Sequence, residues 1–254
     1  MKFSWDRRIA RAGELLQTNS TVSELLRFYQ HLARFQKTIY EAVAASDEHD
    51  VAGLVRHFPG LLNLINESGS TALKQAAAAF AEVSAEERLE LLTVFWQHEV
   101  ESREMPAEYT FLASVVLQPF AEYLAERNNS VTESSPPLCP FCGSKPQLAV
   151  LRPEGDGGKR FLLCSLCATE WVFRRVLCPN CAEENKDHLP IFIAQDFDYV
   201  RVDACDTCRT YIKSIDLTKN GNAVPVVDEL ATVSLNLWAQ ENNYQKLQAN
   251  LFGV

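Results

Sequence analysis

The chain has 254 residues, of which 47% are hydrophobic and 22% are charged, and its formal net charge is −9 at pH 7. This length allows two domains that each bury a core of their own. The negative charge argues against nucleic-acid binding, which needs basic surface. The sequence also contains no apolar stretch long enough to cross a bilayer, so we expect a soluble protein with no membrane span.

The first 130 residues contain no cysteine and show helical periodicity. In the stretch 22–46, apolar residues recur at steps of three and four, which is typical of an amphipathic helix. We expect about six helices here, packed as an all-α bundle. The apolar stripe of the stretch 22–46 consists of Leu25, Leu26, Tyr29, Leu32, Phe35 and Ile39.

Start signals of helices occur at several points in this region. Ser84 and Glu87 have the spacing of a capping box. Ser70 or Thr71 is expected to cap the alanine-rich helix that precedes them.

Two prolines shape the last helix of the region. Pro106 is well placed in a first helical turn, where its missing N–H costs nothing. Pro119 lies inside the same helix and should kink or break it.

A polar, proline-ended stretch at 126–137 indicates a linker. We therefore divide the chain into a helical domain, 1–130, and a metal-ribbon domain with a C-terminal helix, 131–254. The predicted fold class is α+β.

Every cysteine in the chain belongs to a Cys-x-x-Cys pair. Two residues between two thiols let both sulfurs of one tight turn bind a single ion, and two such turns supply the four thiolates of a tetrahedral site. The sequence therefore predicts two mononuclear four-cysteine sites. The eight expected ligands are Cys139, Cys142, Cys164, Cys167, Cys178, Cys181, Cys205 and Cys208.

Cysteine pairs also occur in disulfides, in redox motifs and around iron–sulfur clusters. Disulfides are disfavoured because the N-terminal sequence lacks the apolar core of a signal peptide. A thioredoxin-type redox motif needs one reactive pair, whereas this chain has four. Four cysteines can also hold an iron–sulfur cluster, but the spacing favours mononuclear sites.

The gaps between the pairs favour sequential grouping. There are 21 residues between Cys142 and Cys164, and 23 between Cys181 and Cys205. Both gaps are near the zinc-ribbon pattern, in which two knuckles face each other across a small sheet. An interleaved grouping stays open because spacing alone does not settle connectivity.

The residue after each second ligand is expected to adopt a positive φ. Gly143 does so at little cost. Ala168, Ala182 and Arg209 occupy the same position in the other knuckles, and a positive φ there would cost each about 1 kcal/mol.

Four thiolates suit zinc or a single rubredoxin-type iron, with no coordination position open for substrate. The thiols need a reducing compartment to stay available to metal, which points to the cytoplasm. Because nothing in the helical region forms a catalytic constellation either, we expect a protein that is not an enzyme.

Alternation of apolar and polar residues predicts strands at 161–178 and 191–216, and the segment 153–161 has the composition of a hairpin loop. The segment 224–244 returns to helical spacing and should pack back on a ribbon. Each half of the cysteine region thus has the order knuckle, strand, knuckle. Two tandem rubredoxin-like or zinc-ribbon modules are expected, stabilised by metal because so short a ribbon buries little apolar surface.

Several motifs resemble the FdhE family of formate dehydrogenase accessory proteins. They are "CPFCGSKP", "CSLCATEW", "CDTCRTYIKSIDLTK" and "PVVDELATVSLNLW", with the ending "NNYQKLQANLFG". The resemblance covers about residues 138–254. The chain departs from the family pattern at Val172, where a histidine is frequent, and at Asn243, where glycine is usual.

The resemblance implies a cytoplasmic accessory protein that binds the molybdenum- or tungsten-containing catalytic subunit of formate dehydrogenase during its maturation or proofreading. It also implies rubredoxin-type iron sites, with the eight cysteines as ligands. The alternative function is an iron-containing electron carrier or redox protein that uses the same sites.

Four residues that follow knuckles are candidates for a partner-binding surface: Glu170, Trp171, Arg209 and Tyr211. The simpler interpretation is that Trp171 and Tyr211 pack on the ribbons. A homodimer is left open, because small ribbon domains often bury an edge in this way.

Overall fold

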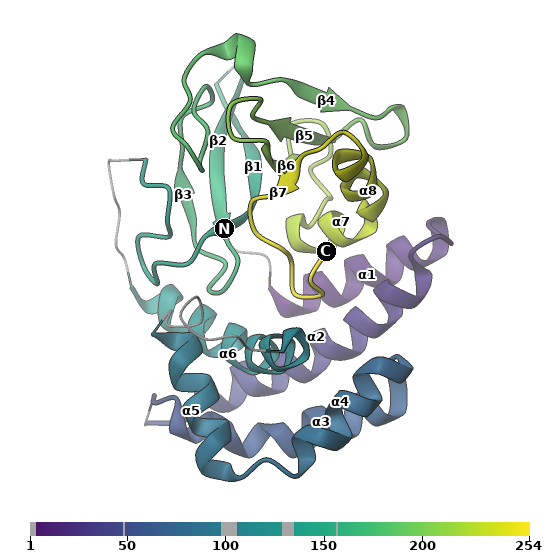
Figure 1. The fold of residues 1–254 in the computed structure, drawn as a ribbon, viewed down its shortest axis with the longest axis vertical. Coiled ribbons are helices and arrows are strands. Elements are labelled where there is room, and N and C mark those ends of the chain that lie inside the picture. The colour runs from purple at the N-terminus through teal and green to yellow at the C-terminus, as the bar shows by residue number, and fades with distance from the viewer. Residues whose placement is uncertain (1–3, 48, 98–105, 129–134, 156) are drawn as a thin grey trace.

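The computed structural model describes residues 4–47, 49–97, 106–128, 135–155 and 157–254. A helical part and a sheet part lie against each other (Figure 1). The described helical part has the six α-helices expected, together with one short 3-10 helix. They are α1 (Trp5–Thr18), α2 (Ser23–Ala44), η1 (Ala52–His57), α3 (Phe58–Ser68), α4 (Thr71–Ala81), α5 (Ala85–Trp96) and α6 (Ala107–Arg127).

The predicted helix caps are confirmed. Ser84 Oγ accepts a hydrogen bond from the Glu87 N–H at 3.2 Å, and the Glu87 carboxylate accepts one from the Ser84 N–H at 3.0 Å. Ser70 caps α4 by accepting from the Leu73 N–H. Local sequence therefore determines where these helices begin.

Pro119 does not break α6, which continues to Arg127. Proline removes the N–H that would bond to the carbonyl four residues earlier, here that of Val115. In the fold, Gln36 of α2 donates to this carbonyl oxygen at 3.1 Å. Of the predicted kink or break, the break does not occur, and a side chain from a neighbouring helix supplies a donor in place of the lost N–H.

The described residues of the sheet part form a seven-stranded sheet in the order β3-β2-β1-β6-β5-β4, with β7 also paired to β6. The hairpin predicted at 153–161 joins β1 to β2, which pair antiparallel. The strands and 3-10 helices are β1 (Pro146–Glu154), β2 (Gly157–Cys164), β3 (Glu170–Val172), η3 (Lys186–His188), β4 (Ile191–Ile193), η4 (Gln195–Phe197), β5 (Val200–Ala204), β6 (Thr210–Asp216) and β7 (Gln245–Lys246).

The two predicted ribbons are the two halves of this sheet. One half consists of β1, β2 and β3, and the other of β4, β5 and β6. The halves join where β1 and β6 pair in parallel, with Val150 opposite Ile215. Each ribbon thereby gains a neighbour at an edge that would otherwise be exposed.

The helical segment predicted at 224–244 forms two helices, α7 (Pro225–Ala231) and α8 (Val233–Glu241). Leu235 and Ala239 of α8 pack in one apolar cluster with Val202 of β5 and Ile215 of β6. The segment thus covers one face of the sheet, as expected.

The helical part and the sheet part share apolar contacts. Ala12 of α1 and Tyr29 of α2 belong to one buried cluster with Val227 and Leu230 of α7. Near the C-terminus, the ring of Phe252 lies 6.0 Å from that of Phe28, measured between centroids. The boundary predicted at 130/131 lies outside the described residues, and the division into two domains stays a prediction.

A buried ion cluster ties the C-terminal segment to the sheet and to α7. The Glu229 carboxylate is inaccessible to solvent and accepts from Lys213 Nζ at 2.8 Å and Lys246 Nζ at 2.5 Å. Asn250 Nδ2 donates to the second oxygen at 2.8 Å. Because Lys213 lies on β6 and Lys246 on β7, one carboxylate holds three elements together.

The two sides of this cluster respond differently to burial. Burial lowers the pKa of Lys213 to about 8, against the attraction of Glu229. Burial by itself would raise the pKa of Glu229, but Lys213 and Lys246 outweigh it and lower that pKa to about 2. The carboxylate therefore stays ionised because two cations face it.

Replacing this carboxylate should destabilise the protein strongly. The substitution Glu229→Gln keeps the shape but leaves buried ammonium groups without a counter-charge, which should cost about 3–5 kcal/mol of unfolding free energy. Urea denaturation measures this loss. The matched control is Glu14→Gln, because Glu14 also pairs with a cation, Arg11, but its side chain is 63% exposed. Equal, small losses in both variants would contradict the role of the cluster.

The same carboxylate should contribute to acid sensitivity. The pKa of Glu229 is lower in the folded state than its ordinary value of 4.5. Its stabilising contribution is therefore present above about pH 4.5 and is lost as the pH falls towards 2, in total about 3 kcal/mol. Urea denaturation across acid pH should show a shallower loss in Glu229→Gln than in the unchanged protein. Parallel curves would rule this contribution out.

Candidate metal centres

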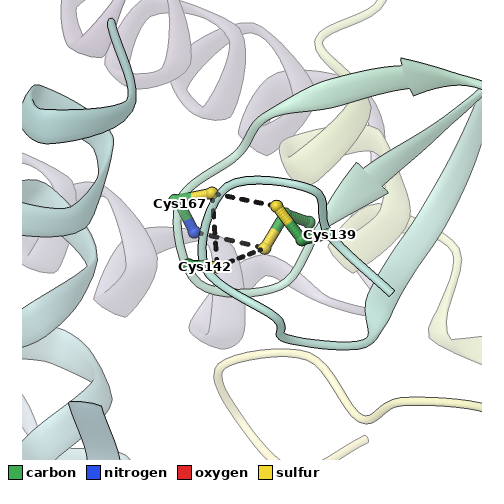
Figure 2. A group of neighbouring side chains, drawn as sticks. Cys139, Cys142 and Cys167 are labelled. Carbon is green, nitrogen blue, oxygen red and sulfur yellow. Dashed lines mark hydrogen bonds between the residues drawn. The ribbon is translucent and has the colours of Figure 1, made fainter. Parts of the chain in front are cut away.

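The first group of sulfurs lies between two turns at one end of the first ribbon. Figure 2 shows the Cys139, Cys142 and Cys167 sulfurs directed towards one another from these turns. The Sγ–Sγ distances are 3.5 Å for Cys139–Cys167, 3.4 Å for Cys142–Cys164 and 3.5 Å for Cys142–Cys167.

The second group repeats this arrangement in the second ribbon. Sγ of Cys178 lies 3.7 Å from that of Cys208, and Sγ of Cys181 lies 3.7 Å from that of Cys205. Within each group of four, all sulfurs lie within 4.8 Å of one another. The grouping is the sequential one favoured by the gaps, not the interleaved alternative.

The distances fit a tetrahedral metal. With a metal–sulfur bond of about 2.3 Å, the sulfurs of a regular tetrahedron are about 3.8 Å apart. The observed 3.4–3.7 Å is close to this value. None of the eight cysteines forms a disulfide. Both groups could therefore hold one ion each, and the geometry suits zinc and iron equally.

The protonation chemistry of the first group also suits a cation. Hydrogen bonds from Cys142, Cys164 and Cys167 lower the pKa of the Cys139 thiol. Burial, together with the neighbouring sulfurs, raises the pKa of the Cys164 thiol. The thiolate form of Cys139 is thus stabilised, whereas deprotonation of Cys164 is disfavoured. A divalent cation would remove this conflict, because it favours the deprotonated form of all four ligands.

Each knuckle is shaped by the same backbone bond. The N–H of the first cysteine donates to the carbonyl five residues later, as Cys139 does to Ser144 and Cys205 does to Thr210, both at 2.9 Å. The residue after the second cysteine then has a positive φ. As the sequence predicts, these φ values are 76° for Gly143, 50° for Ala168, 61° for Ala182 and 56° for Arg209.

Hydroxyl groups lie beside one sulfur in three knuckles, a feature that sequence reasoning missed. Thr169 Oγ1 is 3.0 Å from Cys167 Sγ, and Thr210 Oγ1 is 3.0 Å from Cys208 Sγ. Ser144 Oγ is 3.4 Å from Cys142 Sγ. The signal was present, because a serine or threonine stands two positions after the second cysteine of these knuckles.

The hydroxyl beside Cys208 affects its acidity. Burial raises the pKa of the Cys208 thiol, but hydrogen bonds, with that of Thr210 foremost, outweigh burial and lower the pKa to about 6. Hydrogen bonds to metal-bound sulfur are among the means by which proteins tune such sites.

The remaining knuckle, at Cys178–Cys181, has Glu183 at the corresponding position. Its carboxylate accepts from Thr207 Oγ1 at 2.5 Å and lies 3.2 Å from His188 Nδ1. The hydrogen bond from Thr207 is the main reason that the pKa of Glu183 is lowered, to about 2. Glu183 thereby links the knuckle at Cys178–Cys181 to the knuckle at Cys205–Cys208.

The two groups differ in exposure. Cys139, Cys164 and Cys167 are buried, and they pack in one cluster with Ala121 and Ala125 of α6. In the second group Cys181 is exposed. The first site is therefore shielded by the helical part, whereas the second can be reached from solvent.

The four candidate partner-binding residues differ in their exposure to solvent. Trp171 is 4% exposed and Tyr211 is 2% exposed. The indole Nε1 of Trp171 donates to the Pro136 carbonyl at 2.9 Å. Both aromatic side chains thus pack on the ribbons, in keeping with the simpler interpretation of the sequence.

The two charged candidates are more accessible. Glu170 accepts two hydrogen bonds of 2.7 Å from Arg152, and its side chain is 15% exposed. The Arg209 side chain is 58% exposed and pairs with Asp206 at 3.2 Å. A partner role for these residues stays a prediction.

In the part of the chain that the structure describes, no helix has both the length and the apolar character to cross a membrane.

Comparison with known families gives consistent matches across the cysteine region. The profile "FdhE, central domain" matches residues 138–175, and "FdhE, C-terminal domain" matches residues 176–252. The first group of cysteines falls within the first match and the second group within the second. The profile boundary therefore separates the same two sites as the geometry does.

Curated relatives are similar over parts of different length. "Protein FdhE homolog" from Aquifex aeolicus is 34% identical over 207 residues, which are 81% of this chain and 72% of that protein. The protein of the same name from Edwardsiella ictaluri is 35% identical over 115 residues, 45% of this chain and 37% of that protein. The crystal structure of the FdhE protein from Pseudomonas aeruginosa has a TM-score of 0.77 at 23% identity, covering 99% of this chain and 97% of that one. That likeness shows the same fold.

We expect two metal ions per chain, measured by elemental analysis after purification without oxygen. Cys164→Ser and Cys205→Ser should each remove about one ion, because each breaks one of the two sulfur groups. A chelator should empty the second site first, because Cys181 is exposed. A folded protein without metal would contradict both sites, and removal of both ions by either substitution would contradict their independence.

Proposed function

This chain belongs to the FdhE family, and from that membership we propose that it is a cytoplasmic accessory protein required for formate dehydrogenase activity. It would bind the catalytic subunit of that enzyme during maturation or proofreading. Two four-cysteine sites, each with one iron or zinc ion, would stabilise the domain that makes this contact.

The observation that carries the proposal is the pair of four-sulfur groups within one sheet. Each group supplies four ligands, the full number for a tetrahedral ion, so no position is left for a substrate. A structural or electron-storing site has this composition, whereas a hydrolytic zinc site keeps a position for water. The protein is therefore proposed to act by binding rather than by catalysis.

The ligand side chains of this chain would perform two tasks when an ion is bound. The eight thiolates would hold the ions, and the hydroxyls of Ser144, Thr169 and Thr210 would donate to the sulfur beside them. Such donors stabilise the thiolate form and influence the potential of an iron site. The reducing environment that the free thiols require is that of the cytoplasm.

A second candidate function is an iron-containing electron carrier. The exposure of Cys181 favours it, because an electron partner could approach this edge of the second site. Reversible bleaching of a visible iron–thiolate absorption by a defined electron donor would support the carrier. A colourless protein that contains two zinc ions would remove it.

The accessory function predicts capture of the catalytic subunit. An affinity-tagged chain, purified without oxygen with both ions in place, should retain the formate dehydrogenase catalytic subunit from a lysate of the same organism. Retention is measured by mass spectrometry and by formate oxidation in the eluate. Loss of capture in a protein that keeps two metal ions would contradict the proposed partner.

Two charged positions test where the partner binds. The double substitution Glu170→Ala and Arg209→Ala should weaken capture about tenfold, as expected when charged interface side chains lose their partners. The metal content should stay unchanged. A matched control is Arg174→Ala with Glu184→Ala, an exposed ion pair of the same ribbon region at 2.7 Å. Equal capture by both double variants would remove Glu170 and Arg209 from the interface.

A further inference from the structure

A cavity of about 140 Å³ lies beside the second group of cysteines, and we call it the Arg160 cavity. Arg160 comes from β2, and Arg201 and Asp203 come from β5. Along β5, Val200, Val202 and Ala204 pack in the cluster that contains α8 residues. Because side chains alternate along a strand, Arg201 and Asp203 face the opposite side of the sheet. The cavity thus opens on the sheet face that α8 does not cover.

Arg160 is a buried cation at this cavity. It is 4% exposed and donates from Nη1 to the carbonyls of Arg174 and Leu177, both at 3.2 Å. Its Nε and that of Arg201 have no hydrogen-bond partner among the residues that the structure describes. Burial lowers the pKa of Arg160, and the nearby Arg201 and Arg175 also lower it, whereas the charges of Asp203 and Cys178 act in the opposite direction. A negative group in the cavity would relieve this unfavourable burial.

The charged side chains that line the cavity are mostly positive. Of the described residues that line it, Arg160, Arg175 and Arg201 are positive and Asp203 is negative. The Asp203 carboxylate accepts from the Ser214 hydroxyl at 2.5 Å and from Arg201 at 3.3 Å, and it also lies 3.7 Å from Arg160 Nη2. Its Oδ1 and the Tyr211 hydroxyl have no hydrogen-bond partner among the described residues. Two positive charges are thus in excess.

The adjoining metal site limits this excess. Cys178 and Cys205 also line the cavity, and four thiolates around one divalent ion carry a charge of about −2. The surroundings as a whole are therefore close to neutral, which disfavours a dianion. A carboxylate suits guanidinium donors by its planar shape as well as by its charge.

The walls near the opening are apolar. Val176 is 44% exposed and Ile191 is 53% exposed, and Leu177 and Leu189 line the cavity with them. A dry cavity of about 150 Å³ accommodates a benzene-sized molecule. The ligand therefore needs a small apolar body in addition to its charged group.

We propose that the Arg160 cavity binds a small monocarboxylate, with its carboxylate towards Arg160 and Arg201 and an apolar body of about four to six carbons against Val176 and Ile191. This site is separate from the metal sites and does not depend on the proposed accessory function. Metal in the second site supports it by holding the wall formed at Cys178 and Cys205, and the charge of that site disfavours a dianion.

The test is calorimetric titration of the full, metal-loaded chain with isovalerate. Saturable binding is expected with a dissociation constant on the order of 1 mM, typical of so small a ligand. Isovaleramide has the same shape without the charge and should bind at least about tenfold more weakly. Phosphate should show no binding of comparable strength. Equal binding of acid and amide, preference for phosphate, or no binding of isovalerate would each overturn the proposal.

Two valine substitutions test whether isovalerate binds in the Arg160 cavity. Val176→Glu places a carboxylate at the cavity opening and should weaken isovalerate binding about tenfold. Val172→Glu is the matched control, because Val172 is also exposed, at 38%, and does not line the cavity. Equal affinities in both variants would place the ligand elsewhere. Both positions are on the surface, so the comparison does not depend on a buried arginine variant folding correctly.

Discussion

The convergence of four sulfurs at each site is the constraint on which the sheet part depends. Thiolates at 3.4–3.7 Å repel one another unless a cation lies between them. The tight knuckles that direct them inward need a backbone conformation that alanine and arginine adopt only at a cost. A bound metal ion would offset both penalties, and it would join strand ends that are far apart in sequence.

The two four-cysteine sites have the same cysteine spacing pattern, but their surroundings in the fold differ. The first is covered by α6 and by the Trp171 ring, whereas the second lies next to a cavity and has an exposed cysteine. A buried site of this kind suits a structural role. The second site can be reached from solvent at Cys181.

Charged residues in the interior make the assembly of the parts specific. Arg8 of α1 forms a bidentate pair with Glu122 of α6 at 2.8 and 2.9 Å. Glu229 of α7 forms ion pairs with both Lys213 and Lys246. Buried ion pairs contribute little net stability by comparison with apolar packing, but a missing partner is costly. They therefore favour one arrangement of the helices and of the C-terminal segment over others.

Features that depend on neighbours in the chain were predictable from the sequence: the four knuckles and their positive φ, the capping box at Ser84 and the β1–β2 hairpin. The gaps between the cysteine pairs favoured the sequential grouping, and the fold settled it. Tertiary structure decided what depends on distant residues. Gln36 of α2 lets α6 continue past Pro119, and the pairing of β1 with β6 merges two ribbons into one sheet. Arg160 and Arg201 meet at one cavity only because β2 and β5 lie in that sheet. A turn is determined by the torsion preferences of a few adjacent residues, whereas these contacts exist only after the chain has folded.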